Sequence, residues 1–191
     1  GDKVIAICAK RMKDEGRLAK DTAVVTVMSN MGFFKFCEEN SINCAKTAVG
    51  DRYVLEKMLK DGYNIGGEQS GHIIFLDHST TGDGELSGAM LLSIMKRTGE
   101  KLSDLAKIME RYPQVLINVK VSNEGKLSFY TDKEVKAEIN RVTEILGDTG
   151  RILVRVSGTE PLVRVMLEGE NLEQIQTLAE EAAQVVRERL A

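Results

Sequence analysis

A short polar segment between two apolar runs carries the residues that an anion-binding loop needs. Ser157, Gly158 and Thr159 supply two hydroxyl groups and a glycine that lets backbone N–H groups approach a ligand closely. Arg155 and Arg164 flank this segment, and strand alternation places Arg155 on the face that Ser157 shares. A guanidinium can hold a phosphate through two parallel hydrogen bonds. The segment predicts a phosphate site; the alternative is a plain hairpin loop with an exposed arginine on each side.

A glycine-rich segment, residues 66–72, carries hydrogen-bonding groups suited to a sugar. Glu68, Gln69, Ser70 and His72 lie among three glycines after a predicted strand. Loops at the carboxyl ends of strands are the usual ligand sites of α/β sheets, and an anionic Glu can accept hydrogen bonds from a sugar hydroxyl or amine. His72 could be a general base or a donor to a phosphate. The alternative is a turn with a capping Ser and a surface His.

A third segment, residues 47–53, joins a predicted strand to a predicted helix. Gly50 permits a tight turn, and Asp51 can cap the helix that follows. Arg52, close to the N-terminus of that helix, would reinforce binding of an anion. The alternative is an Asp cap beside a solvated Arg.

The remaining reactive residue types have structural interpretations. Asp83 precedes a helical pattern and is predicted to be its cap, since two carboxylates with glycines are too few for a cation cage. The three cysteines are an odd number without CxxC spacing, which favours reduced, buried thiols: Cys8, Cys37 and Cys44. No Walker lysine motif, GxSxG elbow or Cys/His pair is present, so the sequence shows no nucleophile of its own and no metal site.

Composition limits the class of protein that must position these residues. The 191 residues are 42% hydrophobic, enough for one large domain or two small ones. Lys and Arg number 26 against 29 Asp and Glu, for a net charge of −3, which gives no electrostatic basis for binding nucleic acid or an anionic membrane. No apolar run approaches the roughly 20 residues of a membrane span. We therefore expect a soluble, cytoplasmic protein.

Hydrophobic periodicity predicts two domains. Residues 1–112 alternate helix and strand patterns, which indicates a βαβ-layered α/β domain with a mostly parallel sheet. Beyond Pro113 the period becomes that of a half-buried strand, and residues 113–191 predict a smaller α+β domain with the order β-α-β-β-α. The predicted helices are 4–12, 31–40, 54–61, 84–97, 102–109, 131–146 and 171–186, and the predicted strands 22–28, 42–49, 63–65, 72–76, 115–121, 151–156 and 162–168. The chain starts directly on a helical pattern, so we expect it to be cut from a longer protein.

The three polar segments, in this order and separation, resemble the α-D-phosphohexomutase superfamily over essentially the whole chain. The matching motifs are Gly-Glu-Gln-Ser-Gly-His at 67–72, Arg-Val-Ser-Gly-Thr-Glu-Pro at 155–161 and Val-Gly-Asp-Arg-Tyr at 49–53. Gln69 and the last of these motifs look most like the bacterial phosphoglucosamine mutases. Members have four domains, and this chain resembles the third and fourth.

The resemblance implies a role for each matching residue. Glu68, Ser70 and His72 would bind the hydroxyl or amino groups of the sugar. Arg52, with Asp51, would lie in a turn of the same substrate site. The residues that would grip the phosphate that is not transferred are Arg155, Ser157, Gly158, Thr159 and Arg164. Val156 stands where many relatives have Pro, which loosens the loop backbone without removing its donors.

The implied reaction interconverts glucosamine 6-phosphate and glucosamine 1-phosphate through a 1,6-bisphosphate and a phosphoserine enzyme. The phosphoserine loop and the Asp-Gly-Asp-x-Asp-Arg loop that holds Mg²⁺ have no counterpart here, so the missing N-terminal domains would supply both. The chain alone is therefore expected to be inactive, and a homodimer is compatible with the resemblance. Two alternatives stay open: a phosphomannomutase/phosphoglucomutase specificity, and a phosphosugar-binding module without catalysis.

Overall fold

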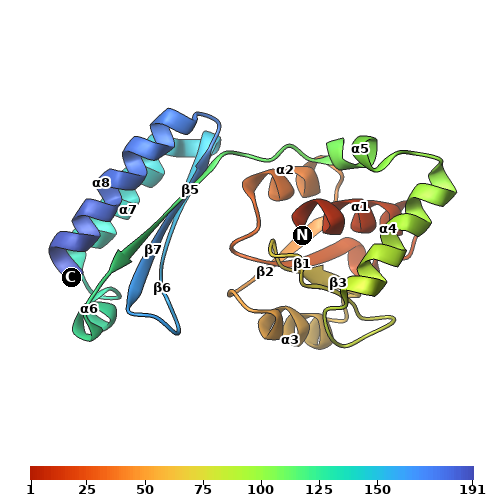
Figure 1. Ribbon diagram of the computed structural model, residues 1–191, viewed down its shortest axis with the longest axis horizontal. Helices are drawn as coiled ribbons and strands as arrows, with labels where there is room; N and C mark the ends of the chain where they lie inside the picture. The colour runs from red at the N-terminus through yellow and green to blue at the C-terminus, as the bar shows by residue number, and fades with distance from the viewer. The chain divides into compact units, whose positions relative to one another are not determined.

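The computed structural model describes residues 1–191 as two compact units, Gly1–Arg111 and Tyr112–Ala191 (Figure 1). The division falls beside Pro113, where the sequence changes from alternating helices and strands to a half-buried strand. No helix combines the length and apolar character needed to cross a bilayer.

The first unit is built on a four-stranded sheet with the order β2-β1-β3-β4. Its strands are β1 (Thr22–Thr26), β2 (Asn43–Thr47), β3 (Ile65–Gly67) and β4 (Ile73–Phe75). β1 pairs in parallel with β2 and with β3, whereas β4 runs antiparallel to β3. The mostly parallel sheet that the sequence predicts is confirmed, with β4 as its one antiparallel strand. The short loop between β3 and β4 cannot make the long crossover that a parallel neighbour requires.

Helices cover both faces of this sheet. They are α1 (Asp2–Asp14), α2 (Met31–Glu39), α3 (Asp51–Asp61), α4 (Gly84–Thr98) and α5 (Leu102–Leu105), with short 3₁₀ turns η1 (Ala19–Asp21) and η2 (Ala106–Ile108). Apolar residues of α1, α2 and α4 form one buried cluster with β1, and α3 packs Val54 and Met58 against Val24 and Ile74 in a second cluster. Figure 1 shows α3 on the far side of the strands from α1 and α2. The unit is thus an α/β/α sandwich.

Local sequence signals fix where these helices begin and end. Asn30 accepts a hydrogen bond from the Gly32 N–H at the start of α2, and Asp83 accepts one from the Leu86 N–H at the start of α4. The Asp83 cap is therefore confirmed. Gly62 and Gly99 end α3 and α4 with φ of 73°, a left-handed conformation that glycine adopts at little cost.

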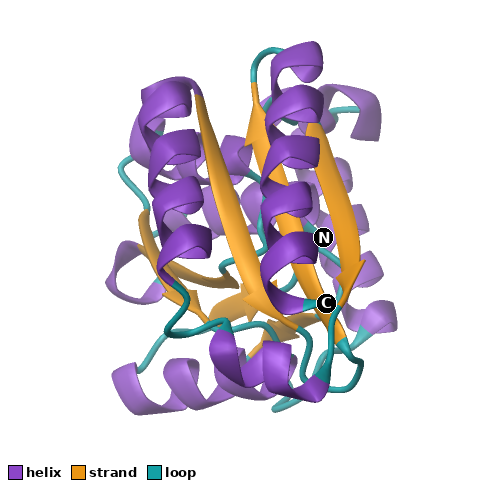
Figure 2. Cartoon of the chain, turned by 90° about the vertical axis from the view of Figure 1, so that its left-hand side faces the viewer, coloured by secondary structure: helices purple, strands orange, loops and turns teal.

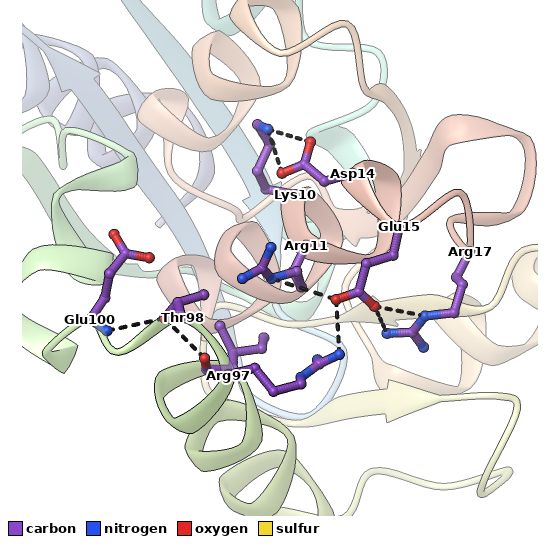
Figure 3. A network of polar contacts seen from close by, with 9 residues as sticks. Lys10, Arg11, Asp14, Glu15, Arg17, Arg97, Thr98 and Glu100 are labelled. Carbon is purple, nitrogen blue, oxygen red and sulfur yellow. Dashed lines mark hydrogen bonds and ion pairs between the residues drawn. The ribbon is translucent and has the colours of Figure 1, made fainter.

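A surface network joins the C-terminal ends of α1 and α4 (Figure 3). The Glu15 carboxylate contacts three guanidinium groups. Arg11 Nε lies 3.6 Å from Glu15 Oε1, Arg17 Nε lies 2.9 Å from Oε2, and Arg97 Nη1 lies 2.9 Å from Oε1. The hydrogen bond from Arg17, with the nearby positive charges, lowers the pKa of the Glu15 carboxyl group. These side chains are partly exposed, so the network contributes modestly to stability.

The second unit is an antiparallel three-stranded sheet with two long helices on one face (Figure 2). Its strands are β5 (Gln114–Lys120), β6 (Gly150–Val156) and β7 (Leu162–Gly169), and its helices are α6 (Asn123–Ser128), α7 (Lys133–Leu146) and α8 (Leu172–Leu190), with a 3₁₀ turn η3 (Gly147–Thr149). The central strand β7 pairs with β5 and β6. Alternate residues of the strands, among them Val163 and Val165, pack against α7 and α8.

Two features of this unit differ from the prediction. Helix α6 lies in a stretch without a periodic pattern, and it starts where Ser122 Oγ accepts a hydrogen bond from the Gly125 N–H. Helix α7 is capped by Asp132, whose carboxylate accepts from the Val135 N–H, whereas the predicted capping box began at Thr131. The shift arises because Asp132 itself takes the extended conformation of a cap.

Gly125 places α6 directly against the end of α8. A Cβ atom built on Gly125 would lie 1.9 Å from the Leu190 carbonyl oxygen, so no side chain fits there without movement of the backbone. We predict that Gly125→Ala destabilises the second unit by about 1 to 3 kcal/mol, the usual cost of overpacking. The measurement is urea unfolding followed by the amide resonances of β7.

The matched control is Gly88→Ala in α4, where a new Cβ would meet no neighbour within 4 Å. The helix propensity of alanine should stabilise that variant by up to about 1 kcal/mol. Equal stability of Gly125→Ala and the unsubstituted chain would show that the α6–α8 contact is not tight.

Candidate functional site

Two of the three polar segments meet at one edge of the first sheet. Strands β1, β2 and β3 are parallel, so their carboxyl ends, Thr26, Thr47 and Gly67, point the same way. The turn before α3 follows β2, and the glycine-rich loop follows β3. This edge is where ligands of open α/β sheets bind.

The Glu68 side chain ties the two segments together. Its Oε1 atom accepts a hydrogen bond from the Gly50 backbone N–H at 3.0 Å. Within the loop, the Glu68 N–H donates to the His72 carbonyl oxygen, and the Gly71 N–H donates to that of Glu68. Gly71 has φ of 101°, which favours glycine at this turn. One oxygen of the Glu68 carboxylate is thus fixed by the protein, and the other makes no hydrogen bond within the chain.

His72 lies between the turn before α3 and the loop before α4. Its Nε2 atom is 3.2 Å from Asp51 Oδ2, and the two side chains are 39% and 56% exposed. The imidazole ring lies against the backbone of Gly82, where an added Cβ would come within 2.3 Å of the ring. Asp51 was predicted to cap α3, and this was wrong: the cap residue is Gly50, and no side chain caps the helix. Asp51 instead faces His72.

The same loop turns its other side chains toward a different hollow. Gln69 and Ser70 line a depression of about 650 Å³ with Asp2, Asn30 and Arg111. Asp2 is only 5% exposed, and its Oδ2 accepts from the Asn30 N–H at 2.7 Å. Burial raises the pKa of the Asp2 carboxyl group, and the bond from Asn30 opposes that shift. The loop thus borders this hollow at Gln69 and Ser70, and the α3 turn at Glu68 and His72.

Arg52 does not join these residues. Its side chain is 81% exposed, and its Nε atom donates to Glu56 Oε1 at 2.7 Å along the surface of α3. The hydrogen bond to Glu56 raises the pKa of the Arg52 guanidinium. The structure gives Arg52 no contact with Glu68, Ser70 or His72, although it lies next to Asp51 in the sequence.

In the second unit, the phosphate segment is the loop between β6 and β7. Ser157 is 3% exposed, its N–H donates to the Leu162 carbonyl oxygen at 2.8 Å, and its Oγ accepts from the Glu160 N–H at 3.3 Å. The Ser157 hydroxyl group thus closes the loop. Gly158 and Thr159 are exposed, and their backbone N–H groups have no partner within the chain. A Cβ on Gly158 would meet nothing within 4 Å, so the fold itself leaves open space there.

The two flanking arginines face each other directly. Arg155 of β6 and Arg164 of β7 are register partners in the antiparallel ladder. The Nε atom of each is buried without a hydrogen-bond partner. Arg164 also forms an ion pair with Glu160 at 2.6 Å. Burial, and secondarily the charge of Arg164, lowers the pKa of the Arg155 guanidinium. Like charges opposite each other destabilise a sheet, and an anion between them would reverse that effect.

Helix α6 braces this loop from outside. Lys126 Nζ donates to the Glu160 carbonyl oxygen at 3.0 Å, and the Val121 N–H donates to the carbonyl oxygen of Pro161. Figure 1 shows α6 and the β6–β7 loop at the same end of the sheet. Lys126 adds a third cation near the loop. Sequence reasoning missed Lys126, because its contact depends on the unpredicted helix α6.

No group of three or more His, Cys, Asp or Glu side chains in residues 1–191 is arranged to hold a metal ion. The carboxylates of Glu68 and Asp51 are committed to Gly50 and His72. The side chains of this chain therefore do not fit a Mg²⁺ site.

Comparison with protein-family models matches both units. Residues 1–112 match the model described as phosphoglucomutase/phosphomannomutase, alpha/beta/alpha domain III, and residues 116–185 match the phosphoglucomutase/phosphomannomutase C-terminal domain. The three-layer unit with its carboxyl-edge loops and the antiparallel unit with its arginine loop are thus the third and fourth domains of a phosphohexomutase. The chain belongs to the phosphoglucomutase/phosphomannomutase family.

Among curated proteins, the chain is similar to bacterial phosphoglucosamine mutases. It is 55% identical over 189 residues to the phosphoglucosamine mutase of Clostridium tetani, covering 99% of this chain and 42% of that protein. It is 53% identical over 190 residues to that of Caldanaerobacter subterraneus subsp. tengcongensis, with 100% and 42% covered. The chain spans about two fifths of the length of these relatives.

Solved structures show the same fold. An Aspergillus fumigatus N-acetylphosphoglucosamine mutase gives a TM-score of 0.84 at 20% identity, over 99% of this chain and 43% of that one. The same fungal enzyme in complex with GlcNAc-6P and magnesium gives 0.78 at 18% identity, over 100% and 44%. These similarities confirm the α/β plus α+β fold predicted from the sequence.

The repulsion between the Arg155 and Arg164 guanidinium groups can be tested by unfolding, with and without phosphate. We predict that Arg155→Met leaves the second unit as stable as before or more stable by up to about 1 kcal/mol without phosphate, because a repulsive cross-strand pair is removed. Inorganic phosphate should stabilise the unsubstituted chain and not the variant, since a ligand that binds only the folded state raises its stability. Thermal unfolding with and without phosphate measures both effects.

Arg141→Met is the control for charge alone. It removes a partly exposed arginine of α7 that pairs with Glu138 and Glu181, and the phosphate effect should survive. A loss of stability in phosphate-free Arg155→Met would show instead that Arg155 has a structural partner.

Proposed function

We propose that this chain is the substrate-holding part of a phosphoglucosamine mutase. The enzyme would interconvert glucosamine 6-phosphate and glucosamine 1-phosphate through a 1,6-bisphosphate and a phosphoserine, a step in amino-sugar and cell-wall precursor synthesis. The family match and the relatives of that name support the proposal. The observation that carries it is the pair of facing guanidinium groups, Arg155 and Arg164, beside a loop with free N–H groups.

In this proposal the β6–β7 loop holds the phosphate that is not transferred. Arg155 and Arg164 supply charge, Thr159 supplies a hydroxyl group, and the N–H groups of Gly158 and Thr159 supply further donors. Ser157 acts mainly through its backbone, since its hydroxyl group already accepts from the Glu160 N–H. Phosphoryl transfer depends on positioning and charge stabilisation, so holding one phosphate still directs the other to the reacting groups.

The first unit would recognise the sugar. Glu68 would use its free carboxylate oxygen for a hydroxyl or amino group, because the other oxygen is bound to Gly50. His72 would contribute a ring nitrogen, and Ser70 a hydroxyl group. Arg52 would take part only if it left Glu56, since the two side chains are paired here.

The remaining requirements of the reaction would be met outside this chain. Mg²⁺ would supply charge stabilisation at the transferred phosphoryl group when bound, and no residues present here fit it. The phosphoserine and the metal loop belong to the N-terminal domains that the longer relatives have in addition. We place the enzyme in the cytoplasm, where its phosphosugar substrates are.

Arg155→Ala in the intact enzyme should raise KM for glucosamine 6-phosphate roughly 10- to 100-fold. A charge-assisted hydrogen bond contributes about 1.5 to 3 kcal/mol, and loss of ground-state binding appears in KM. Steady-state kinetics measures the change, and Arg141→Ala on the surface of α7 is the matched control. An unchanged KM in Arg155→Ala would contradict the assignment, and preference for glucose or mannose phosphates in competition would point to the phosphomannomutase/phosphoglucomutase specificity.

The Gly158→Ala substitution should affect ligand affinity without affecting fold stability. Because no atom lies within 4 Å of the added Cβ and the fold does not require glycine there, thermal stability should change by less than about 0.5 kcal/mol. The methyl group would occupy the space next to the free N–H groups, so affinity for the phosphosugar should fall at least about tenfold, or 1.4 kcal/mol. Calorimetric titration measures it, and undiminished affinity would place the phosphate elsewhere.

A further inference from the structure

Two separate contacts join the glycine-rich loop to the turn before α3. The first is the hydrogen bond between Glu68 Oε1 and the Gly50 N–H, at 3.0 Å. The second is the approach of His72 Nε2 to Asp51 Oδ2, at 3.2 Å. Gly50 and Asp51 are consecutive residues, so one turn fixes both ends of the loop.

The His72 ring has little freedom in this position. Gly82 lies against it so closely that a Cβ there would overlap three ring atoms, within 2.5 Å. The Nε2 atom is shielded from solvent and makes no hydrogen bond, and the Asp51 carboxylate, at 3.2 Å, is the charged group beside it. The backbone of His72 is held as well, because its carbonyl oxygen accepts the Glu68 N–H.

Asp51 is the acidic residue of the first turn of α3, where the helix dipole favours a carboxylate only modestly. It does not cap α3, since Gly50 is the cap residue and no side chain accepts from the first turn. Its contact with His72 is about half exposed, and pairs of this kind add little to fold stability.

We propose that Asp51 is a positioning residue, which holds the His72 imidazole so that Nδ1 faces the substrate. The inference rests on the proposed function, in which His72 binds the sugar phosphate. A carboxylate beside Nε2 favours the tautomer with the proton on Nε2, because the partner of one ring nitrogen sets the state of the other. Nδ1 is then an acceptor for a sugar hydroxyl group, or a donor to a phosphate oxygen when the ring is protonated. Asp51 acts through His72 and not on the substrate.

A double-mutant cycle in the intact enzyme tests this directly. We expect Asp51→Ala to reduce kcat/KM for glucosamine 6-phosphate about tenfold, within the range of coupled neighbours. In the His72→Ala background the same change should reduce it less than about twofold, because the residue through which Asp51 acts is gone. Asp77→Ala, which removes an exposed carboxylate bonded to Asn64, is the control and should have no effect in either background.

Equal losses in the two backgrounds would overturn the proposal, because Asp51 would then act on the substrate or on the fold. An unchanged kcat/KM in Asp51→Ala would overturn it as well. Rescue by Asp51→Glu, and not by Asp51→Leu, would support it, since only the carboxylate can pair with Nε2.

A second measurement is independent of catalysis and uses this chain. It has two histidines, His72 and His78, and His78 is exposed, so long-range ¹H–¹⁵N spectra contain one test ring and one internal control. With the rings neutral, His72 should show a single tautomer with the proton on Nε2, and His78 an averaged pattern. In Asp51→Ala the His72 pattern should approach that of His78.

An unchanged His72 spectrum in Asp51→Ala would show that Asp51 does not orient the His72 ring, and would overturn the proposal. The two experiments also separate this inference from the proposed function. If His72→Ala alone left kcat/KM unchanged, the assignment of His72 to the substrate site would fail, and the ring spectrum would still decide whether Asp51 orients the ring.

Discussion

Arg155 and Arg164 face each other across β6 and β7, and most of the second unit serves to keep them there. The antiparallel register makes them direct partners. The core residues on the opposite face of the sheet pack under α7 and α8, so a shift by one residue would exchange the arginines with valines of the core. Only Arg164 has an acidic partner, Glu160. The repulsion that remains is a cost in the absence of ligand, and in the proposed function a bound phosphate would turn it into a source of affinity.

The first unit has the opposite electrostatic character at its own loops. Glu68 and Asp51 bring two carboxylates to the carboxyl edge of the parallel strands, each with one oxygen committed to the protein. In the proposed function, these carboxylates are the partners of a hydroxyl or amino group of the sugar.

The sequence predicts the parts of this molecule that follow from local periodicity. The long helices and strands, the Asp83 cap and the placement of Arg155 away from the core all follow from spacing and residue type. Features that depend on tertiary contacts could not be predicted from the sequence. Residues 66 and 67 look like loop but pair as β3 with β1, and Asp51 looks like a cap until the loop bearing His72 lies against it. Arg52 matches a family motif, yet its guanidinium group forms an ion pair with Glu56, one turn further along the same helix.

The end of α8 is connected to the phosphate loop through helix α6. The Leu190 carbonyl oxygen accepts from the Ser122 N–H and lies against Gly125, and α6 in turn presents Lys126 to Glu160. Helix ends open more readily than helix centres. A ligand that binds only when a segment is ordered also stabilises the ordered form of that segment. If the loop binds phosphate as proposed, binding and the closing of the last helical turn are linked equilibria, and hydrogen exchange at Leu190 and Ala191 would report on the occupancy of a loop about thirty residues away in the sequence.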